Sequence, residues 1–381
     1  MAVAPALPFP QNFAAALDEL LIQACQEFQL TPTRYDLAVA RYDTLNKVLE
    51  SAASPFRFSE PEIYPQGSMA LGTTVTPIQG PHDLDFVLEL SRSHVGVDPM
   101  ELIRLLYGFL RQHGTYRSMT SLKRRCVRIE YADEFYMDVL PACRNLALGG
   151  TCVKVPDRAV QGWSDSNPKG YIDWFRKKSQ MVFVGRMMDK AAPIPDQQAV
   201  AEKEVLQLLV QLAKRWRDLY YATVDRELAP ISVVLTTLAA ETYRGERSLS
   251  QALSSMLDGI VDLIDRSRRR GERHLHLCNP SNTAEDLTER WDSNPVAYDA
   301  FERGIRDFRR RWFQLVTRQS NGDAELAALF GEPITTVLRK RTQRIQESRL
   351  GGKLGVTSTG VITSSSGAAA RVQPNNFYGA E

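Results

Sequence analysis

The sequence predicts a two-lobed α+β protein, in which a mixed sheet faces a C-terminal lobe made of helices. Two observations carry this prediction. Between residue 55 and about residue 141, short extended runs with alternating apolar residues are separated by turn residues, as in strands. From about residue 201, apolar residues recur at three- and four-residue spacing, as in packed helices. The 381 residues, 43% of them hydrophobic, suffice for two lobes.

The N-terminal part is expected to begin with helices and continue with strands. Residues 12–53 predict two helices that brace both lobes, with a break near Thr31-Pro32-Thr33. Another helix is expected over residues 98–113. The runs 126–131 and 135–141 have strand-like patterns and are separated by a short polar break, which indicates a β-hairpin.

The second half is expected to be helical after a loop. Residues 150–180 are interpreted as loop-like and rich in aromatic residues. Helices are then predicted from Glu202 to about Tyr221, from Pro230, and near residues 248–268, 284–291 and 296–318. The small residues after Gly351 are typical of disorder. We therefore expect a catalytic lobe with its bracing helices over 1–200, a helical lobe over 201–345 and a flexible tail over 346–381.

Composition bears on location and partners. The formal net charge of +2 does not favour a polyanion-binding protein, so activation by nucleic acid is not indicated. The five cysteines show neither CxxC pairs nor zinc-ligand spacing, which indicates free thiols in a reducing compartment. No segment approaches the roughly 18 apolar residues of a membrane-spanning helix, and the N-terminus is a poor signal peptide. We expect a cytoplasmic protein without a membrane partner.

One predicted strand carries two carboxylates on the same face. In the run His82-Asp-Leu-Asp-Phe, successive side chains point to opposite sides of the sheet, so Asp83 and Asp85 project together, away from the apolar residues. Asp138 lies on a later strand and is expected beside them. Carboxylates forced together repel one another unless a cation joins them, and Mg²⁺ prefers such oxygen ligands. Solvated surface acids are the alternative interpretation.

A Gly-Ser turn precedes this strand. Gly67 and Ser68 provide a backbone that phosphate oxygens can approach closely, with a hydroxyl beside it. Phosphoryl transfer requires mainly positioning, metal ions and charge stabilisation, and two metal ions require shared carboxylates. The ordered set of this turn, the paired aspartates and Asp138 therefore predicts nucleotidyl transfer.

The same residues carry a resemblance to a known family. The set Gly67-Ser68, Asp83-Leu84-Asp85 and Asp138 resembles the signature of the DNA polymerase β-like nucleotidyltransferases. Two further segments, Ser166-Asn-Pro-Lys-Gly-Tyr and Asn279-Pro-Ser-Asn-Thr-Ala-Glu-Asp-Leu, resemble one branch, the bacterial CD-NTases, which are relatives of cyclic GMP-AMP synthase and oligoadenylate synthase. The likeness covers roughly residues 12 to 345. The loop between Ser68 and Asp83 is longer than in the general superfamily pattern.

The resemblance implies roles for individual residues. Asp83 and Asp85 would bind two Mg²⁺ ions, with Mn²⁺ as a possible substitute, and Asp138 would complete the catalytic site. Gly67 and Ser68 would hold the donor triphosphate. Lys214 and Ser232 look like the second-lobe phosphate contacts of the family. From the sequence itself, Lys214 could equally be a cation at a helix C-terminus, and Ser232 a helix cap.

Two neighbouring features leave alternatives open. The aromatic residues of 163–175 could stack on a base or, more simply, pack in the core. His82, beside the carboxylates, is most simply a solvated histidine in a turn.

The resemblance also implies an activity and partners. It implies a synthase that joins ribonucleoside triphosphates, ATP among them, into a cyclic di- or trinucleotide in antiphage (CBASS) signalling. The aromatic end of the tail, Asn375 to Glu381, could dock a regulatory or conjugating partner. The alternatives are a nucleotidyltransferase that modifies a tRNA or a protein, and a non-catalytic nucleotide-binding protein of the same fold.

Overall fold

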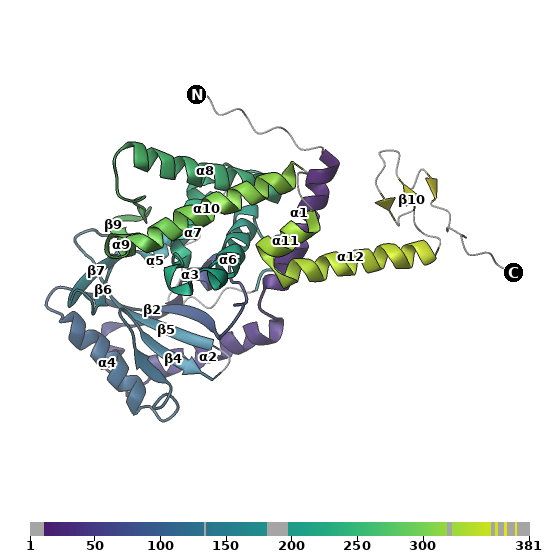
Figure 1. Ribbon diagram of the computed structural model, residues 1–381. Helices are drawn as coiled ribbons and strands as arrows, with labels where there is room; N and C mark the ends of the chain where they lie inside the picture. Colours follow the sequence, from purple (N-terminus) through teal and green to yellow (C-terminus); the bar gives the residue numbers. More distant parts are fainter. Residues whose placement is uncertain are drawn as a thin grey trace.

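The structure, a computed structural model, describes residues 11–132, 135–180, 197–317 and 322–351, together with 355–356, 362–363 and 370–371. Figure 1 shows a sheet lobe below and a lobe of helices above it, which confirms the predicted two-lobed α+β fold. None of the helices in these ranges is long and apolar enough to cross a membrane.

The main sheet is mixed. Its strands run in the order β1 (Glu62–Pro65), β2 (His82–Ser93), β5 (Phe135–Arg144), β4 (Val127–Tyr131) and β3 (Thr120–Leu122), and β6 (Val153–Asp157) extends it from β5 and pairs with β7 (Gly162–Ser166). The central strands β2 and β5 are parallel, whereas the other neighbours are antiparallel. The predicted hairpin is β4–β5.

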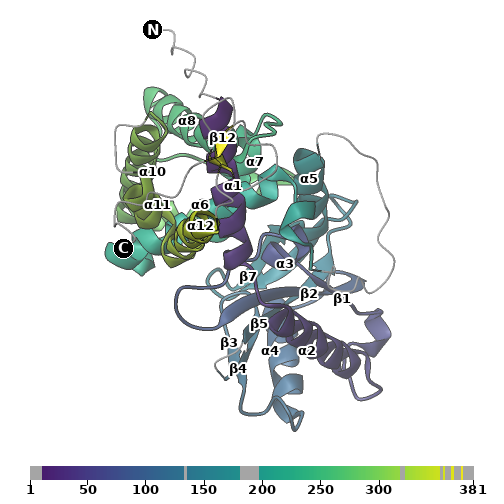
Figure 2. The ribbon, with the colours of Figure 1, turned by 90° about the vertical axis from the view of Figure 1, so that its right-hand side faces the viewer.

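One face of this sheet is covered by two helices, α2 (Pro32–Glu50) and α4 (Pro99–Gln112), on the side remote from the helical lobe (Figure 2). Leu84 and Phe86 of β2 are fully buried in the core beneath these helices. Because strand side chains alternate, Asp83 and Asp85 must point to the opposite face, toward the helical lobe.

The helical lobe surrounds a second core. Its helices are α6 (Val205–Thr223), α7 (Ser232–Thr242), α8 (Leu249–Arg269), α9 (Glu289–Ser293), α10 (Pro295–Val316), α11 (Gly322–Phe330) and α12 (Glu332–Leu350). The N-terminal helix α1 (Gln11–Phe28) packs against α6, α8 and α12. The residues of α1 belong to the helical core, whereas those of α2 belong to the core of the sheet lobe. Single turns of 3₁₀ helix occur at Arg57–Ser59, Val200–Glu202 and Arg226–Leu228.

Two predictions of secondary structure are wrong. Residues 150–180, expected to be a loop, contain β6, β7 and the helix α5 (Pro168–Gln180). The aromatic residues Tyr171 and Phe175 are the buried face of that helix, whereas β7 is too polar to show an alternating pattern. The expected helix at 284–291 is instead the end of a hairpin, β8 (Cys278–Asn279) with β9 (Asn282–Asp286), followed by α9.

The expected tail contains some regular structure. The helix α12 continues to Leu350. The short strand β10 (Gly355–Val356) pairs with both β11 (Ile362–Thr363) and β12 (Ala370–Arg371). The suggested docking segment, residues 375–381, lies outside the described residues.

Candidate active site

A cleft of about 710 Å³ lies between the carboxylate face of the sheet and the helical lobe. All the residues that the sequence singled out for the site line this cleft: Gly67, Ser68, Asp83, Asp85, Asp138, Lys214 and Ser232. Three arginines that the sequence interpretation missed also line it, namely Arg125, Arg128 and Arg217.

The three aspartates lie on the two central strands. Asp85 is directly opposite Asp138 in the parallel β2–β5 register, and Asp83 precedes Asp85 by two residues on the same face. Burial raises the pKa of Asp85 to about 7, and the negative charges of Asp138 and Asp83 add to the effect. An ionised Asp85 therefore needs a compensating cation.

Arg128 supplies one such positive charge. It lies opposite Asp138 on β4, and its Nε and Nη2 donate to the two oxygens of Asp138 at 2.7 and 2.8 Å. Its Nη2 also lies 3.4 Å from Oδ1 of Asp83. The sequence contained the signal for this contact, because a hairpin joining Tyr131 to Phe135 pairs residue 128 with residue 138.

The donor set suits a hard divalent cation, since it consists of carboxylate oxygens that repel one another. Among the residues that the structure describes, no three His, Cys, Asp or Glu side chains converge as a ready-made metal site. In the cleft, both oxygens of Asp138 are bound by Arg128. The chemistry of the three aspartates thus fits a metal ion, but Arg128 is hydrogen-bonded to one of these candidate ligands, Asp138.

The Gly-Ser turn is fastened to the aspartate strand. It begins the short helix α3 (Gly67–Leu71), and the N–H of Gln66 donates to the carbonyl of Asp85 at 2.8 Å. Gly67 has a φ of +58°, and a Cβ there would lie 2.8 Å from Oδ2 of Asp85. Glycine is therefore required both by the left-handed backbone and by the close approach of the carboxylate.

Lys214 is buried in the middle of α6, not at its C-terminal end, because this helix continues to Thr223. Its Nζ donates to the carbonyl of Thr73 at 3.1 Å and to the hydroxyl of Thr73 at 3.2 Å. Burial, helped by the charge of Arg217, lowers the pKa of Lys214 to about 7. An interaction with the helix dipole does not explain this position.

Ser232 begins α7, but its side chain caps no backbone group. Its Oγ accepts a hydrogen bond from Nη1 of Arg217 at 2.5 Å, and Arg217 is paired with Asp218 at 2.6 Å. Lys214 and Arg217 are three residues apart, so they lie on one face of α6. This spacing could have revealed Arg217 from the sequence.

Two further residues that line the cleft, Tyr171 and His82, pack against neighbouring elements. Tyr171 is the one aromatic residue of 163–175 that lines the cleft, and its hydroxyl is 2.8 Å from Oγ1 of Thr237, which joins α5 to α7. The expectation of a solvated His82 is wrong: His82 is 6% exposed, and burial lowers its pKa to about 4. It packs edge-on against Phe135, which accounts for its burial.

The two segments that resemble the CD-NTases contact each other. Nδ2 of Asn167 donates to the carbonyl of Ser281 at 2.9 Å. Glu285 accepts hydrogen bonds from Asn279 at 2.8 Å and from Ser166 at 3.3 Å. These contacts fix the β8–β9 hairpin against β7 and so close one end of the cleft.

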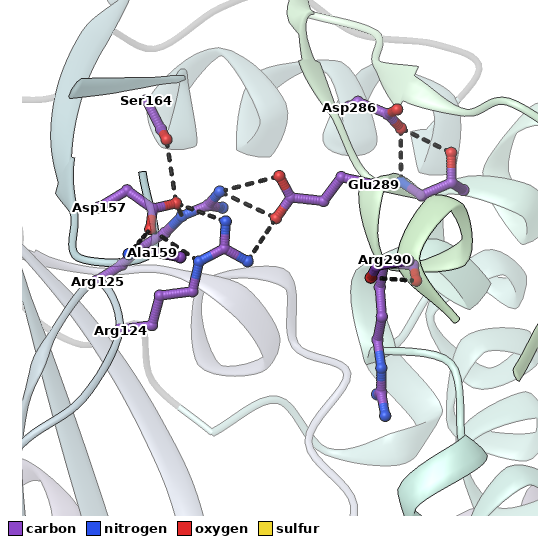
Figure 3. Close-up of polar contacts among 10 residues, drawn as sticks. Arg124, Arg125, Asp157, Ala159, Ser164, Asp286, Glu289 and Arg290 are labelled. Carbon is purple, nitrogen blue, oxygen red and sulfur yellow. Dashed lines mark hydrogen bonds and ion pairs between the residues drawn. The ribbon is translucent and has the colours of Figure 1, made fainter. Parts of the chain in front are cut away.

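An ionic cluster also joins the lobes at this end (Figure 3). We call Arg124, Arg125, Asp157 and Glu289 the lobe clasp. Asp157, fully buried at the end of β6, accepts hydrogen bonds from both arginines at 2.6–2.8 Å. Both arginines also bind Glu289 of α9, at 2.8 and 3.0 Å. Burial opposes ionisation of Asp157, but the hydrogen bonds from the arginines outweigh it and hold its pKa below the usual range.

Comparisons with known proteins now identify the family. Residues 16–179 match the family described as the Second Messenger Oligonucleotide or Dinucleotide Synthetase domain. A c-di-GMP synthase of Roseivirga ehrenbergii is 31% identical over 376 residues, which cover 97% of this chain and 98% of that protein. The chain belongs to the bacterial CD-NTases.

More distant relatives agree with this assignment. The cyclic dinucleotide synthase CdnG of Bradyrhizobium diazoefficiens is 26% identical over 318 residues, covering 77% of this chain and 74% of that protein. The structure of that CdnG in complex with GTP superposes with a TM-score of 0.71 over 86% of this chain and 99% of that chain, at 24% identity. A structure of Escherichia coli CdnC with ATP shares the fold at a TM-score of 0.61 and 14% identity, covering 83% of this chain and 98% of that chain.

Membership confirms the predicted family, the DNA polymerase β-like fold and the nucleotidyltransferase class of this CD-NTase. The prediction of a synthase that joins nucleotides into a second messenger is confirmed by the family that residues 16–179 match. Enzymes of this family generally use divalent metal ions.

Proposed function

We propose that this CD-NTase joins two nucleoside triphosphates into a cyclic dinucleotide in the cleft between its lobes, releasing pyrophosphate, and that it serves antiphage signalling of the CBASS type. The proposal rests on one observation. Three carboxylates, Asp83, Asp85 and Asp138, line the same cleft as the cations Lys214 and Arg217 of α6. The name of the Roseivirga relative, a c-di-GMP synthase, favours GTP as a substrate.

The aspartates would hold the metal. Asp83, Asp85 and Asp138 would bind two Mg²⁺ ions, or Mn²⁺ in their place, through the carboxylate oxygens that face the cleft. Such ions activate an attacking hydroxyl and neutralise charge on the transferred phosphoryl group. Asp138, opposite Asp85 and at the centre of the sheet, would lie on the side of the acceptor hydroxyl.

The opposite wall would hold the triphosphate. The backbone of Gly67 and Ser68 lines the cleft beside Asp85, and Lys214 and Ser232 face it from α6 and α7. Arg217 joins this set through its hydrogen bond to Ser232. Cations and hydroxyls so arranged bind phosphate oxygens and stabilise the charge that develops on the leaving pyrophosphate.

The chain also suits a cytoplasmic enzyme. Its five cysteines are free thiols in the structure, as the sequence predicts. We place the reaction in the cytoplasm, where nucleoside triphosphates are available.

The test is a product analysis with a matched inactive control. The purified protein is incubated with all four ribonucleoside triphosphates and Mg²⁺ or Mn²⁺, beside the variant Asp83→Asn/Asp85→Asn. We expect a cyclic product that resists phosphatase and is absent from the control, identified by mass spectrometry. Transfer of labelled nucleotide to tRNA or protein instead would indicate a macromolecule-modifying enzyme. Nucleotide binding without any turnover would indicate a non-catalytic protein.

A further inference from the structure

Arg128 engages the carboxylates that the proposed metal site requires. Its guanidinium donates from Nε to Oδ1 of Asp138 at 2.7 Å and from Nη2 to Oδ2 at 2.8 Å. The same Nη2 lies 3.4 Å from Oδ1 of Asp83. Both oxygens of Asp138 are thus bound by a side chain that stays positively charged at every physiological pH.

Because of this contact, the guanidinium of Arg128 and a divalent metal ion would compete for the same carboxylate oxygens. Asp85 and Asp138 are paired in the β2–β5 register, so their negative charges repel unless a positive charge lies nearby. The guanidinium of Arg128 satisfies that need through its two hydrogen bonds to Asp138. A divalent ion would need the same oxygen lone pairs and would be repelled by the guanidinium beside them.

Arg128 also has another contact close to Asp138. Its Cζ lies 4.5 Å from the centre of the Tyr136 ring, and Tyr136 precedes Asp138 by two residues on the same face of β5. The side chain of Arg128 is 22% exposed and lines the cleft, so a cleft-bound ion can approach it. The ring can retain the guanidinium when the salt bridge to Asp138 opens.

We propose that Arg128 and a divalent ion compete for the carboxylate of Asp138: Arg128 neutralises the aspartates when no metal is bound and leaves Asp138 when a divalent ion binds. The inference rests on the proposed metal role of the aspartates. It requires that Arg128 stabilises the metal-free protein and weakens metal binding. An arginine that only oriented Asp138 for the metal would strengthen metal binding.

The test measures Mn²⁺ binding without nucleotide, by the electron paramagnetic resonance signal of the free ion. The proteins compared are wild type, Arg128→Met and the control Arg125→Met. Arg125 lines the same cleft, but its guanidinium binds Asp157 and Glu289. The control therefore removes the same charge without releasing Asp138.

We expect Arg128→Met to bind Mn²⁺ about 10-fold more tightly than wild type, or more, and to melt at a lower temperature without metal. Arg125→Met should change the Mn²⁺ affinity by less than about 3-fold, because its charge is bound elsewhere. Arg128→Lys keeps the positive charge, so its Mn²⁺ affinity and melting temperature should remain closer to those of wild type. If Arg128→Met does not fold, Arg128→Gln makes the same comparison.

An unchanged or weaker Mn²⁺ affinity in the Arg128 variants, or no bound Mn²⁺ in any of the proteins, overturns the inference. The variant Asp83→Asn/Asp85→Asn separates this failure from that of the metal assignment. If that variant binds Mn²⁺ as wild type does, the aspartates are not the metal ligands. If it loses Mn²⁺ while Arg128→Met gains nothing, only the role of Arg128 is wrong.

Discussion

The backbone at Gly67 and the carboxylate of Asp85 share a space in which a hydrogen atom fits and a methyl group does not. We expect Gly67→Ala to lower product formation by at least about 100-fold, because the added Cβ would lie 2.8 Å from Oδ2 of Asp85 and displace this proposed metal ligand. The left-handed φ of +58° should also cost about 1–2 kcal/mol of stability. Turnover assays measure the loss of product formation, and urea denaturation measures the loss of stability.

The control is Gly80→Ala. Gly80 also has a positive φ, +84°, but a Cβ there would meet nothing within 4 Å. This variant should therefore lose comparable stability and keep its activity. Equal losses of activity in both variants would show that strain in the loop, not the contact with Asp85, is what matters.

The lowered pKa of Lys214 makes the stability of the folded protein depend on pH. Burial lowers its pKa to about 7, so the folded protein binds a proton at this site less readily than the unfolded chain does. The resulting cost to stability is fully present below pH 7 and disappears as the pH rises toward the unfolded pKa of 10.5. Wild type should thus gain up to about 2.7 kcal/mol over Lys214→Met between pH 7 and pH 9.

Urea denaturation of both proteins at several pH values measures this difference. Lys214→Met should also bind GTP about 10-fold more weakly at pH 7, since the cation proposed to contact the triphosphate is lost. A stability difference that stays constant with pH would mean that Lys214 is stably charged through its contact with Thr73.

At the scale of elements, the sequence predicted features that depend on neighbouring residues, but not contacts between residues far apart in the chain. The alternation in β2 placed Asp83 and Asp85 on one face, because successive strand side chains point to opposite sides. The turn of the β4–β5 hairpin sets Arg128 opposite Asp138, whereas no turn sets the parallel register that brings Asp138 opposite Asp85. The burial of Lys214 could not be predicted, because its partner Thr73 lies 141 residues away. The helix α5 was missed because its aromatic face lacks the leucine-like pattern of the other helices.

The lobe clasp yields a prediction about two carboxylates that bind the same arginines. Asp157 is fully buried and also accepts from the N–H of Ala159, so Asp157→Asn should cost about 3–5 kcal/mol by leaving buried groups unpaired. The side chain of Glu289 is 41% exposed, and Glu289→Gln should cost less than about 1 kcal/mol. Chemical denaturation at neutral pH measures the free energy of unfolding of the two variants. Similar losses would mean that the contact across the lobes, not the burial of Asp157, carries the stability.

For the molecule as a whole, the central question is whether the lobes unfold together. One face of α6 is hydrogen-bonded to the loop that leads from the Gly-Ser turn into β2. Four side chains of α6 donate to carbonyl oxygens of residues 71, 73, 74 and 76: Gln207, Gln211, Lys214 and Arg215. Three of these four bonds involve buried donors, so opening the lobes would leave polar groups without partners.

These contacts predict one cooperative transition. Leu21 of α1 and Leu45 of α2 are both fully buried, but in the separate cores of the helical lobe and the sheet lobe. Leu21→Ala and Leu45→Ala should each cost about 2–5 kcal/mol, and each should shift the same single unfolding transition. Calorimetry, with far-UV circular dichroism as a second probe, measures this shift. If each variant instead splits off its own transition and leaves the other lobe unchanged, the hydrogen bonds of α6 do not couple the lobes. The cleft would then be formed only when a nucleotide draws its two walls together.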